Sequence, residues 1–267
     1  MSLLPLALLR CLALGAAIAL GAPVHAALPP DQLADVGVRP PPGATLPLDA
    51  RLADLEGRAV PLGDAIGKRP AVVVFADYDC PQLCSPILAL AGDALAKSGL
   101  RPGLDYRLVV IGFNPRATAA DGKRMVGGEV GFDSPVGRAT SALIASAPTA
   151  KRLTSAVGFH YAYDAAAARY AHPAALLVVA ADGRLSRLLS GLAISGDDVR
   201  LALVEARKGA VGAVADQLRL LCYGLGASVG LYDKPVRFLL GAAGVTTPLV
   251  IAVGLLALTR TAARRRA

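Results

Sequence analysis

Apolar residues in the middle of the chain follow the patterns of buried strands and of helices with one apolar side. The run AVVVFADY at 71–78 is continuously apolar and rich in β-branched residues, which predicts a buried central strand. From Ser85 to Lys97 the apolar residues recur at helical spacing, and Gly99 stands just past the end. The other predicted elements are a short hairpin edge near 59–62, a strand at 106–114, a helix at 138–157 interrupted near Pro148, a strand at 158–164, a hairpin at 174–192 and a helix at 197–207.

The order of these elements predicts an α/β, thioredoxin-like fold. Strand, helix, strand and helix are followed by a hairpin with Asp182-Gly183 as its turn, and then by a last helix. Ahead of this domain, residues 28–47 are rich in proline, which indicates an extended lead-in and not a packed element.

The N-terminus has the pattern of a secretory signal. Arg10 precedes an apolar stretch at 11–20, and Val24-His25-Ala26 offers the small residues that a signal peptidase reads. Cleavage is therefore expected after Ala26, and an uncleaved N-terminal anchor is the alternative. Apolar residues make up 54% of the 267 residues, an excess that points to membrane segments.

The C-terminus has the pattern of a membrane anchor. No charged residue occurs from Phe238 to Leu258, which is long enough to cross a bilayer, although a buried soluble helix is the alternative. Arginines at 260, 264, 265 and 266 follow, so the positive-inside rule predicts a cytoplasmic C-terminus with the main domain outside. In a bacterium the domain would lie on the periplasmic side of the inner membrane, where an unprotected cysteine pair tends to close.

These segments define the predicted organisation of the chain. It comprises a signal peptide at 1–26, a proline-rich lead-in at 27–47, a thioredoxin-like domain at 48–210, a connector at 211–235, a transmembrane helix at 236–259 and a basic cytoplasmic tail at 260–267. The formal net charge of +8 is explained in part by the terminal arginines, and the other basic residues are scattered. Without a basic stripe or interleaved aromatic residues, we do not expect nucleic-acid binding.

The stretch DYDCPQLCSP at 77–86 places Cys80 and Cys84 where the first buried strand meets the following helix. The unpaired N–H groups and the positive dipole end of a helix N-terminus favour thiolate over thiol. Four positions apart, the two sulfurs can face one side, and three intervening residues leave room for a soft ion such as copper(I) or zinc. A redox pair, a structural disulfide and a metal site all remain open, and the disulfide is the weakest because a buried staple needs no activating helix end.

Two histidines would remain in the mature chain. His160 lies within the predicted strand GFHYAYD and is interpreted as an ordinary strand histidine. His172 lies in the loop before the hairpin, which in this fold can pass beside the N-terminus of the first helix and so approach Cys80 and Cys84. Two thiolates and one imidazole suit three-coordinate copper(I) better than structural zinc, which takes four ligands. Cys222 is interpreted as a buried thiol without an assigned role.

The chain resembles the Sco/SenC family of copper-handling proteins for cytochrome c oxidase assembly. The resemblance is carried by VVVFADYDCPQLC, FNPRATAADGKR and YAHPAALLVVAADGRLSRLLSG, and it extends over residues 46–207. It implies that Cys80 and Cys84 are thiolate ligands of copper and that His172 is the imidazole ligand. The chain departs from the family pattern in having Ser85 before the proline that should follow the second cysteine, and Asn114 where an aspartate is expected.

The resemblance implies a membrane-tethered metallochaperone that delivers copper to the binuclear copper centre of cytochrome c oxidase, with the copper-binding oxidase subunit as partner. The predicted C-terminal anchor resembles that of a bacterial subgroup. The alternative is an enzyme, a thiol–disulfide oxidoreductase that reduces the cysteines of an oxidase subunit before metal arrives. Cys80 and Cys84 would then be the catalytic redox pair, and only copper binding requires His172.

Overall fold

The computed structural model describes residues 30–80, 84–165 and 167–208. The predicted signal peptide, connector, transmembrane helix and basic tail lie outside the described residues, as do Cys11 and Cys222. Within the three described ranges, no helix is both long enough and apolar enough to cross a membrane.

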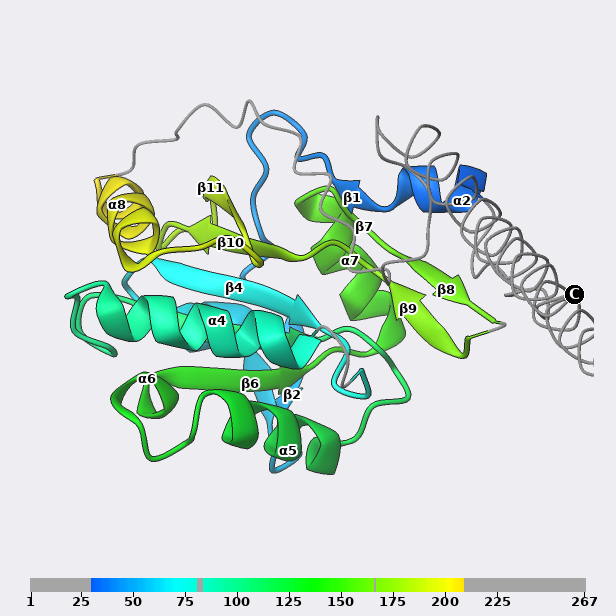
Figure 1. The fold of residues 1–267 in the computed structure, drawn as a ribbon, viewed down its shortest axis with the longest axis horizontal. Coiled ribbons are helices and arrows are strands. Elements are labelled where there is room, and N and C mark those ends of the chain that lie inside the picture. Colours follow the sequence, from blue (N-terminus) through cyan, green and yellow to red (C-terminus); the bar gives the residue numbers. More distant parts are fainter. Residues whose placement is uncertain (1–29, 81–83, 166, 209–267) are drawn as a thin grey trace, which may run out of the picture. The chain divides into compact units, whose positions relative to one another are not determined.

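A seven-stranded mixed sheet forms the centre of the domain, with helices on both of its faces (Figure 1). The strand order is β11-β10-β4-β5-β6-β2-β3. Neighbouring strands β4, β5 and β6 are parallel, and the other pairs are antiparallel. The strands are β2 (Arg51–Asp54), β3 (Ala59–Pro61), β4 (Ala71–Ala76), β5 (Arg107–Gly112), β6 (Thr140–Ile144), β10 (Ala175–Val179) and β11 (Leu185–Ser190).

The alternation of side chains along the central strands creates two apolar cores, one on each face of the sheet. On β4, Val72 and Val74 point into a core shared with helices α4 and α8, while Val73 and Phe75 point into a core shared with α3 and α7. Because both faces are covered, β4 is apolar at every position. The helices are α2 (Pro30–Asp35), α3 (Leu62–Ile66), α4 (Cys84–Lys97), α5 (Ala119–Glu129), α6 (Pro135–Arg138), α7 (Ala147–Ala156) and α8 (Gly196–Arg207).

Most of the elements predicted from the sequence are confirmed. The buried strands at 71–78 and 106–114 are β4 and β5, the helix at 85–97 is α4, and the last helix is α8. The hairpin at 174–192 is β10 and β11, and Gly183 in its turn has a φ of 85°, which glycine adopts at little cost. The hairpin edge near 59–62 is the antiparallel pair of β2 and β3.

The prediction of one interrupted helix at 138–157 is wrong in its first half. Residues Thr140–Ile144 form β6, which is held between β5 and β2. The helix α7 begins only after Ser146, whose side chain accepts a hydrogen bond from the Thr149 amide, and Pro148 lies in its first turn. Proline there starts the helix and does not interrupt it.

The predicted third strand at 158–164 is not part of the main sheet. It is divided into β7 (Phe159–His160) and β8 (Ala162–Asp164), which pair with β1 (Gly37–Val38) and β9 (Arg169–Ala171), respectively. The third parallel strand is β6 instead. Helix α5 was not among the predicted elements, because its sequence has few apolar residues; a capping box of Thr118 and Asp121 begins it.

The proline-rich lead-in is packed against the domain, contrary to the sequence prediction. It contains α2 and β1, and the side chains of Leu33, Val36 and Leu46 are almost fully buried. The amide of Leu46 also donates to the carbonyl of Gly183 in the hairpin turn. The apolar residues between the prolines therefore contribute to the core, which composition alone does not reveal.

Candidate metal centre

The pairing of β10 with β4 brings His172 to the cysteine end of the sheet. The two strands are antiparallel, with Leu177 opposite Val73 and Val179 opposite Ala71. Continuing this register backwards along β10 carries His172 past the end of β4, to the level of the turn that leads into α4. His172 and the turn before α4, which are far apart in the sequence, therefore meet at the same end of the strands.

Cys84 is the first residue of α4, and its side chain is only 3% exposed. Pro86 lies two positions further along, within the first turn, where its missing N–H costs no helical hydrogen bond. The predicted junction of strand and helix is thus confirmed for Cys84. The first turn of a helix carries N–H groups that have no partner within the helix, and such a position favours a thiolate.

The central contact of the site joins Cys84 and His172. The sulfur Sγ of Cys84 lies 2.9 Å from Nε2 of His172, and both side chains are buried. The other ring nitrogen, Nδ1, lies 3.2 Å from the carbonyl oxygen of Pro173. A carbonyl oxygen only accepts hydrogen bonds, so this contact favours a hydrogen on Nδ1 and leaves the Nε2 lone pair directed at the sulfur.

Cys80 lies in the turn between β4 and α4. Its amide donates to the carbonyl oxygen of Asp77 at 3.0 Å, and its half-buried side chain packs against the core that includes Cys84. Among the described residues, no three His, Cys, Asp or Glu side chains are close enough together to hold a metal ion as they stand. The structure thus brings Cys84 and His172 into contact, whereas the role of Cys80 as a third ligand stays a prediction.

Asp77 and Asn114 form a buried hydrogen-bonded pair beside the turn that carries Cys80. Asp77 is 2% exposed, and its Oδ1 accepts hydrogen bonds from Nδ2 of Asn114 at 2.8 Å and from the Asp79 amide at 3.2 Å. Burial raises the pKa of Asp77, while these two hydrogen bonds act in the opposite direction by favouring the carboxylate. The ionised forms of Cys80 and His172 also act on Asp77, the first raising and the second lowering its pKa.

This pair explains one departure from the family pattern. An aspartate at position 114 would face Asp77 across a hydrogen bond, and two carboxylates at that distance repel each other. Asn114 instead donates to Asp77 through its amide nitrogen and accepts from the Arg116 amide through its oxygen. The asparagine is therefore matched to the carboxylate that this chain carries at position 77.

Tyr78 anchors the same turn in the core. Its hydroxyl lies 3.0 Å from the carbonyl oxygen of Val110 and 3.1 Å from that of Leu143, so the turn is tied to β5 and β6. A Cβ atom placed on Gly112 would lie 2.5 Å from the Tyr78 ring, closer than real Cβ contacts. Glycine at position 112 is thus required for the tyrosine to fit.

Solved structures with the same fold include several Sco proteins. An Aquifex aeolicus protein with a suggested role in electron transfer is 23% identical, with a TM-score of 0.55 over 62% of this chain and 94% of that one. Arabidopsis thaliana ScoI with copper bound is 15% identical, with a TM-score of 0.50 over 62% and 98%. An SCO1/SenC family lipoprotein from Bacillus anthracis is 13% identical, with a TM-score of 0.50 over 61% and 96%.

The chain has the thioredoxin-like fold of the Sco structures. No protein-family model matches the sequence, and no curated protein is significantly similar to it. At these identities the likeness establishes the fold, so a function has to be argued from the site itself.

Aromatic rings enclose the histidine of this Sco-like domain. The Phe113 ring meets His172 edge-on at 5.4 Å between centroids, and the Phe159 ring is stacked with it at 6.4 Å. These rings hold the imidazole plane and exclude water from the Cys84 contact. His160, in contrast, is exposed on β7 and takes no part in the site, which agrees with its interpretation as an ordinary strand histidine.

Sequence reasoning identified Cys84 and His172 but missed the residues that support them. Asp77 has a signal in the sequence, because an acidic residue directly after a fully apolar strand indicates a buried polar role. Asn114 stands out in the sequence only because the Sco/SenC pattern has an aspartate at that position. The two rings beside His172 gave no usable signal, because Phe113 lies in the loop after β5 and Phe159 lies on β7.

Proposed function

We propose that this protein binds copper through Cys80, Cys84 and His172 and delivers it to the binuclear copper centre of a cytochrome c oxidase. The observation that carries the proposal is the 2.9 Å contact between Cys84 Sγ and His172 Nε2. A thiolate and an imidazole are donors that copper prefers, and here they come together from residues 88 positions apart in the sequence. The fold shared with copper-bound ScoI of Arabidopsis thaliana supports the same reading.

Cys80 completes the donor set in this proposal. It lies in the turn just before α4, at the same end of the sheet as Cys84 and His172, and a change in that turn would move its sulfur to the ion. Two thiolates favour copper(I), and the imidazole adds the donor that a trigonal site needs. Cys80 is more exposed than Cys84 and His172, so an acceptor protein would reach the copper from the side of Cys80.

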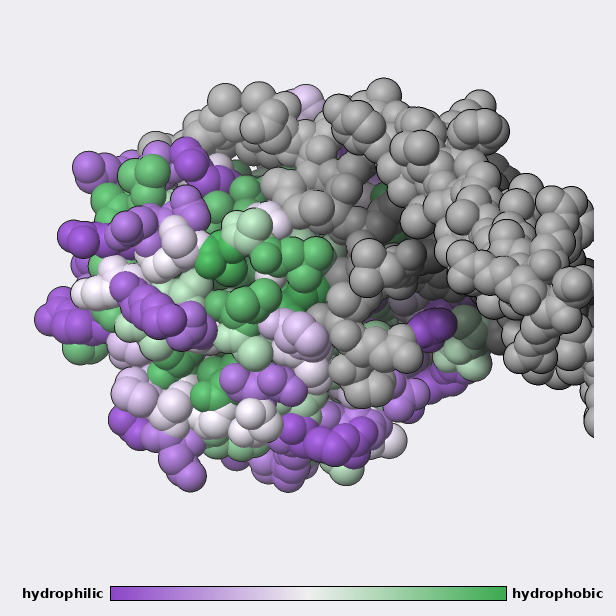
Figure 2. Space-filling model, viewed as in Figure 1, coloured by the Kyte–Doolittle hydropathy of each residue, from purple (hydrophilic) through white to green (hydrophobic). Residues whose placement is uncertain are grey.

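The proposed partner is the copper-binding subunit of the oxidase, and the proposed location is the periplasmic side of a bacterial inner membrane. Residues 236–259 would tether the domain there. The space-filling view shows a hydrophobic area over the N-terminal half of α4, the end that carries Cys84 (Figure 2). Leu90 of this helix is 40% exposed. An apolar surface next to the ligands suits docking of a partner protein.

The test is a copper(I) titration of the reduced full-length chain in neutral detergent, with a competing chelator to measure affinity. His172→Ala is expected to weaken copper(I) binding by at least about tenfold, since even outer-shell changes at metal sites cost about 10–100-fold. It should also abolish the copper(II)–thiolate absorption. His160→Ala is the matched control and should bind as the parent does, because His160 is exposed and outside the site.

Loss of folding has to be separated from loss of a ligand, because His172 is buried. His172→Gln keeps a polar side chain of similar size, and thermal unfolding shows which variants remain folded. A folded His172 variant that binds copper as tightly as the parent would exclude the histidine as a ligand. The proposal also fails if the parent chain takes up no stoichiometric copper.

A thiol–disulfide oxidoreductase is the second candidate, and the same contact favours it. An imidazole that touches a thiol can take its proton and so supply the thiolate that attacks a disulfide. Reduction of a disulfide in an oxidase subunit would form a disulfide between Cys80 and Cys84, with the two electrons passing to the subunit's cysteines. A parent chain that performs this reduction and holds no copper would establish this candidate instead.

A further inference from the structure

A second polar site lies at the opposite end of the sheet from Cys84 and His172. There, β4 begins and β10 ends, since Ala71 pairs with Val179. A pocket of about 360 Å³ opens beside this pair, within the size range of small-molecule sites. Its lining residues are Lys68, Arg69, Pro70, Leu104, Ala180, Ala181, Asp182, Arg184, Ala206 and Arg207.

The pocket, called the basic pocket below, is lined by more positive than negative side chains. Four of the lining side chains are basic and one is acidic. Asp182 pairs with Arg184 at 2.7 Å, which neutralises one of the four. Within the described part of the chain Lys68 forms no ion pair, and Arg69 donates to an uncharged partner, the carbonyl oxygen of Gly103. Two positive charges in the pocket therefore have no counterion of their own.

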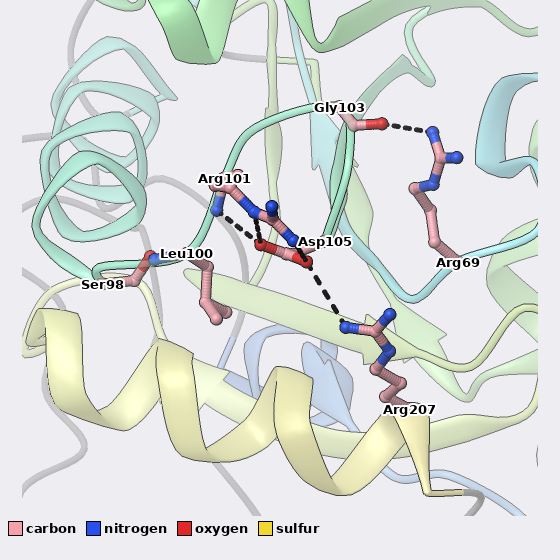
Figure 3. Close-up of polar contacts among 7 residues, drawn as sticks. All are labelled: Arg69, Ser98, Leu100, Arg101, Gly103, Asp105 and Arg207. Atoms are coloured by element: carbon pink, nitrogen blue, oxygen red, sulfur yellow. Dashed lines mark hydrogen bonds and ion pairs between the residues drawn. The ribbon is translucent and has the colours of Figure 1, made fainter.

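Arg207 is held at the edge of the pocket by a carboxylate that is already engaged. Asp105 accepts hydrogen bonds from the Arg101 guanidinium at 2.9 and 3.1 Å, and Arg207 approaches it only to 3.4 Å. Figure 3 shows Arg69, from the loop before β4, and Arg207, from the end of α8, approaching the loop at 101–105. Asp105 thus orients Arg207 while sharing its charge with Arg101, so donors of Arg207 remain available to a ligand.

The other residues that line the pocket have apolar side chains. Pro70, Ala180, Ala181 and Ala206 form its wall, and Leu104 stands at its rim with 61% of its surface exposed. An exposed leucine beside several guanidinium groups suits a ligand that has an anionic head and an apolar body. Guanidinium forks and an ammonium group match the several oxygen atoms of a phosphate group better than the two oxygen atoms of a carboxylate.

We propose that the basic pocket binds a phosphate ester, taken either from a free phosphorylated molecule or from the headgroup of an anionic phospholipid. The site is separate from Cys84 and His172, and the proposal does not rest on the function proposed for them. The four basic side chains would surround the phosphate, and the alanine, proline and leucine side chains would contact the remainder of the ligand.

The two sources can be tested with full-length protein in neutral detergent by isothermal titration calorimetry. One arm uses inorganic phosphate, with chloride at matched ionic strength as the reference. The other arm uses short-chain phosphatidylglycerol added to the micelles, with short-chain phosphatidylcholine as the reference. The variant is Lys68→Gln with Arg184→Gln, which removes two exposed charges and leaves the bonds of Arg69 and Arg207 intact.

The matched control is Lys151→Gln with Arg124→Gln. It removes the same charge from exposed positions outside the pocket, and Arg124 pairs with a nearby aspartate in the sequence, as Arg184 does. We expect saturable binding of at least one probe, weakened about tenfold in the pocket variant and less than twofold in the control. Binding of inorganic phosphate indicates a free phosphorylated ligand, and binding of phosphatidylglycerol alone indicates a headgroup. Equal weakening in both variants, or saturable binding of neither probe, overturns the proposal.

Discussion

A copper(I) ion that binds to both Cys84 and His172 with trigonal angles has to separate these two side chains. Their sulfur and nitrogen atoms are 2.9 Å apart, which is a direct contact. In zinc sites the metal–sulfur bond is about 2.3 Å and the metal–nitrogen bond about 2.0 Å, so an ion with trigonal angles holds the two donors about 3.7 Å apart. Copper bonds of similar length would therefore require the Cys84 and His172 donors to move apart by about 0.8 Å.

The movement is expected at the cysteine and not at the histidine. The imidazole is held by Phe113, Phe159 and the carbonyl oxygen of Pro173, whereas the Cys84 sulfur can move by rotation about one side-chain bond. The cost is small, because a hydrogen-bonded contact of this kind contributes about 0.5–1.5 kcal/mol net. A new metal–ligand bond readily offsets a loss of that size.

The assay combines a crystal structure of the copper(I)-loaded protein with X-ray absorption at the copper edge. The structure should show the Cys84 to His172 distance lengthened to about 3.7 Å, and the spectrum should show one nitrogen neighbour besides sulfur. His172→Ala should lose the nitrogen neighbour, and His160→Ala should keep it. Copper(I) bound in a crystal that retains the 2.9 Å contact would refute the reasoning, because trigonal ligation by both atoms requires a separation of about 3.7 Å.

Three further outcomes are expected. Burial raises the pKa of Asp77 above 3.8, so the folded state holds this proton more tightly, and stability present below that pH is lost as the pH rises through the raised pKa. The free energy of unfolding in urea should therefore change less favourably from about pH 4 to about pH 7 in the parent than in Asp77→Asn. An equal change in the two proteins would contradict this account. Gly112→Ala should lower the free energy of unfolding by about 1–3 kcal/mol, because the new methyl group meets the Tyr78 ring. Gly128→Ala, where nothing lies within 4 Å, should be neutral or stabilising. Reporter fusions after Arg207 and after Arg266 should report opposite sides of the membrane, and the same side for both would exclude a single crossing between them.

Local patterns in the sequence were enough to predict the elements on which the site is built. The unbroken apolar run of β4 is visible because both faces of a central parallel strand are buried. The helix at 84–97 and the hairpin around Gly183 are visible because their apolar spacing, end signals and turn residues act over a few positions. The same method failed at 138–164, where small residues give no clear period and where pairing with distant strands decides the structure.

The sequence also indicated which chemistry to look for, since two cysteines at the start of a helix and one histidine in a loop are a donor set that can be read from the chain. It did not show that His172 touches Cys84, because that contact depends on the antiparallel register of β10 against β4, which links residues about a hundred positions apart. Nor did it show that Asp77 and Asn114 form one buried pair, or that Lys68 and Arg207 line one pocket. These groups become neighbours only when the sheet assembles, since a strand register is set by the packing of both of its faces and not by the residues of one strand.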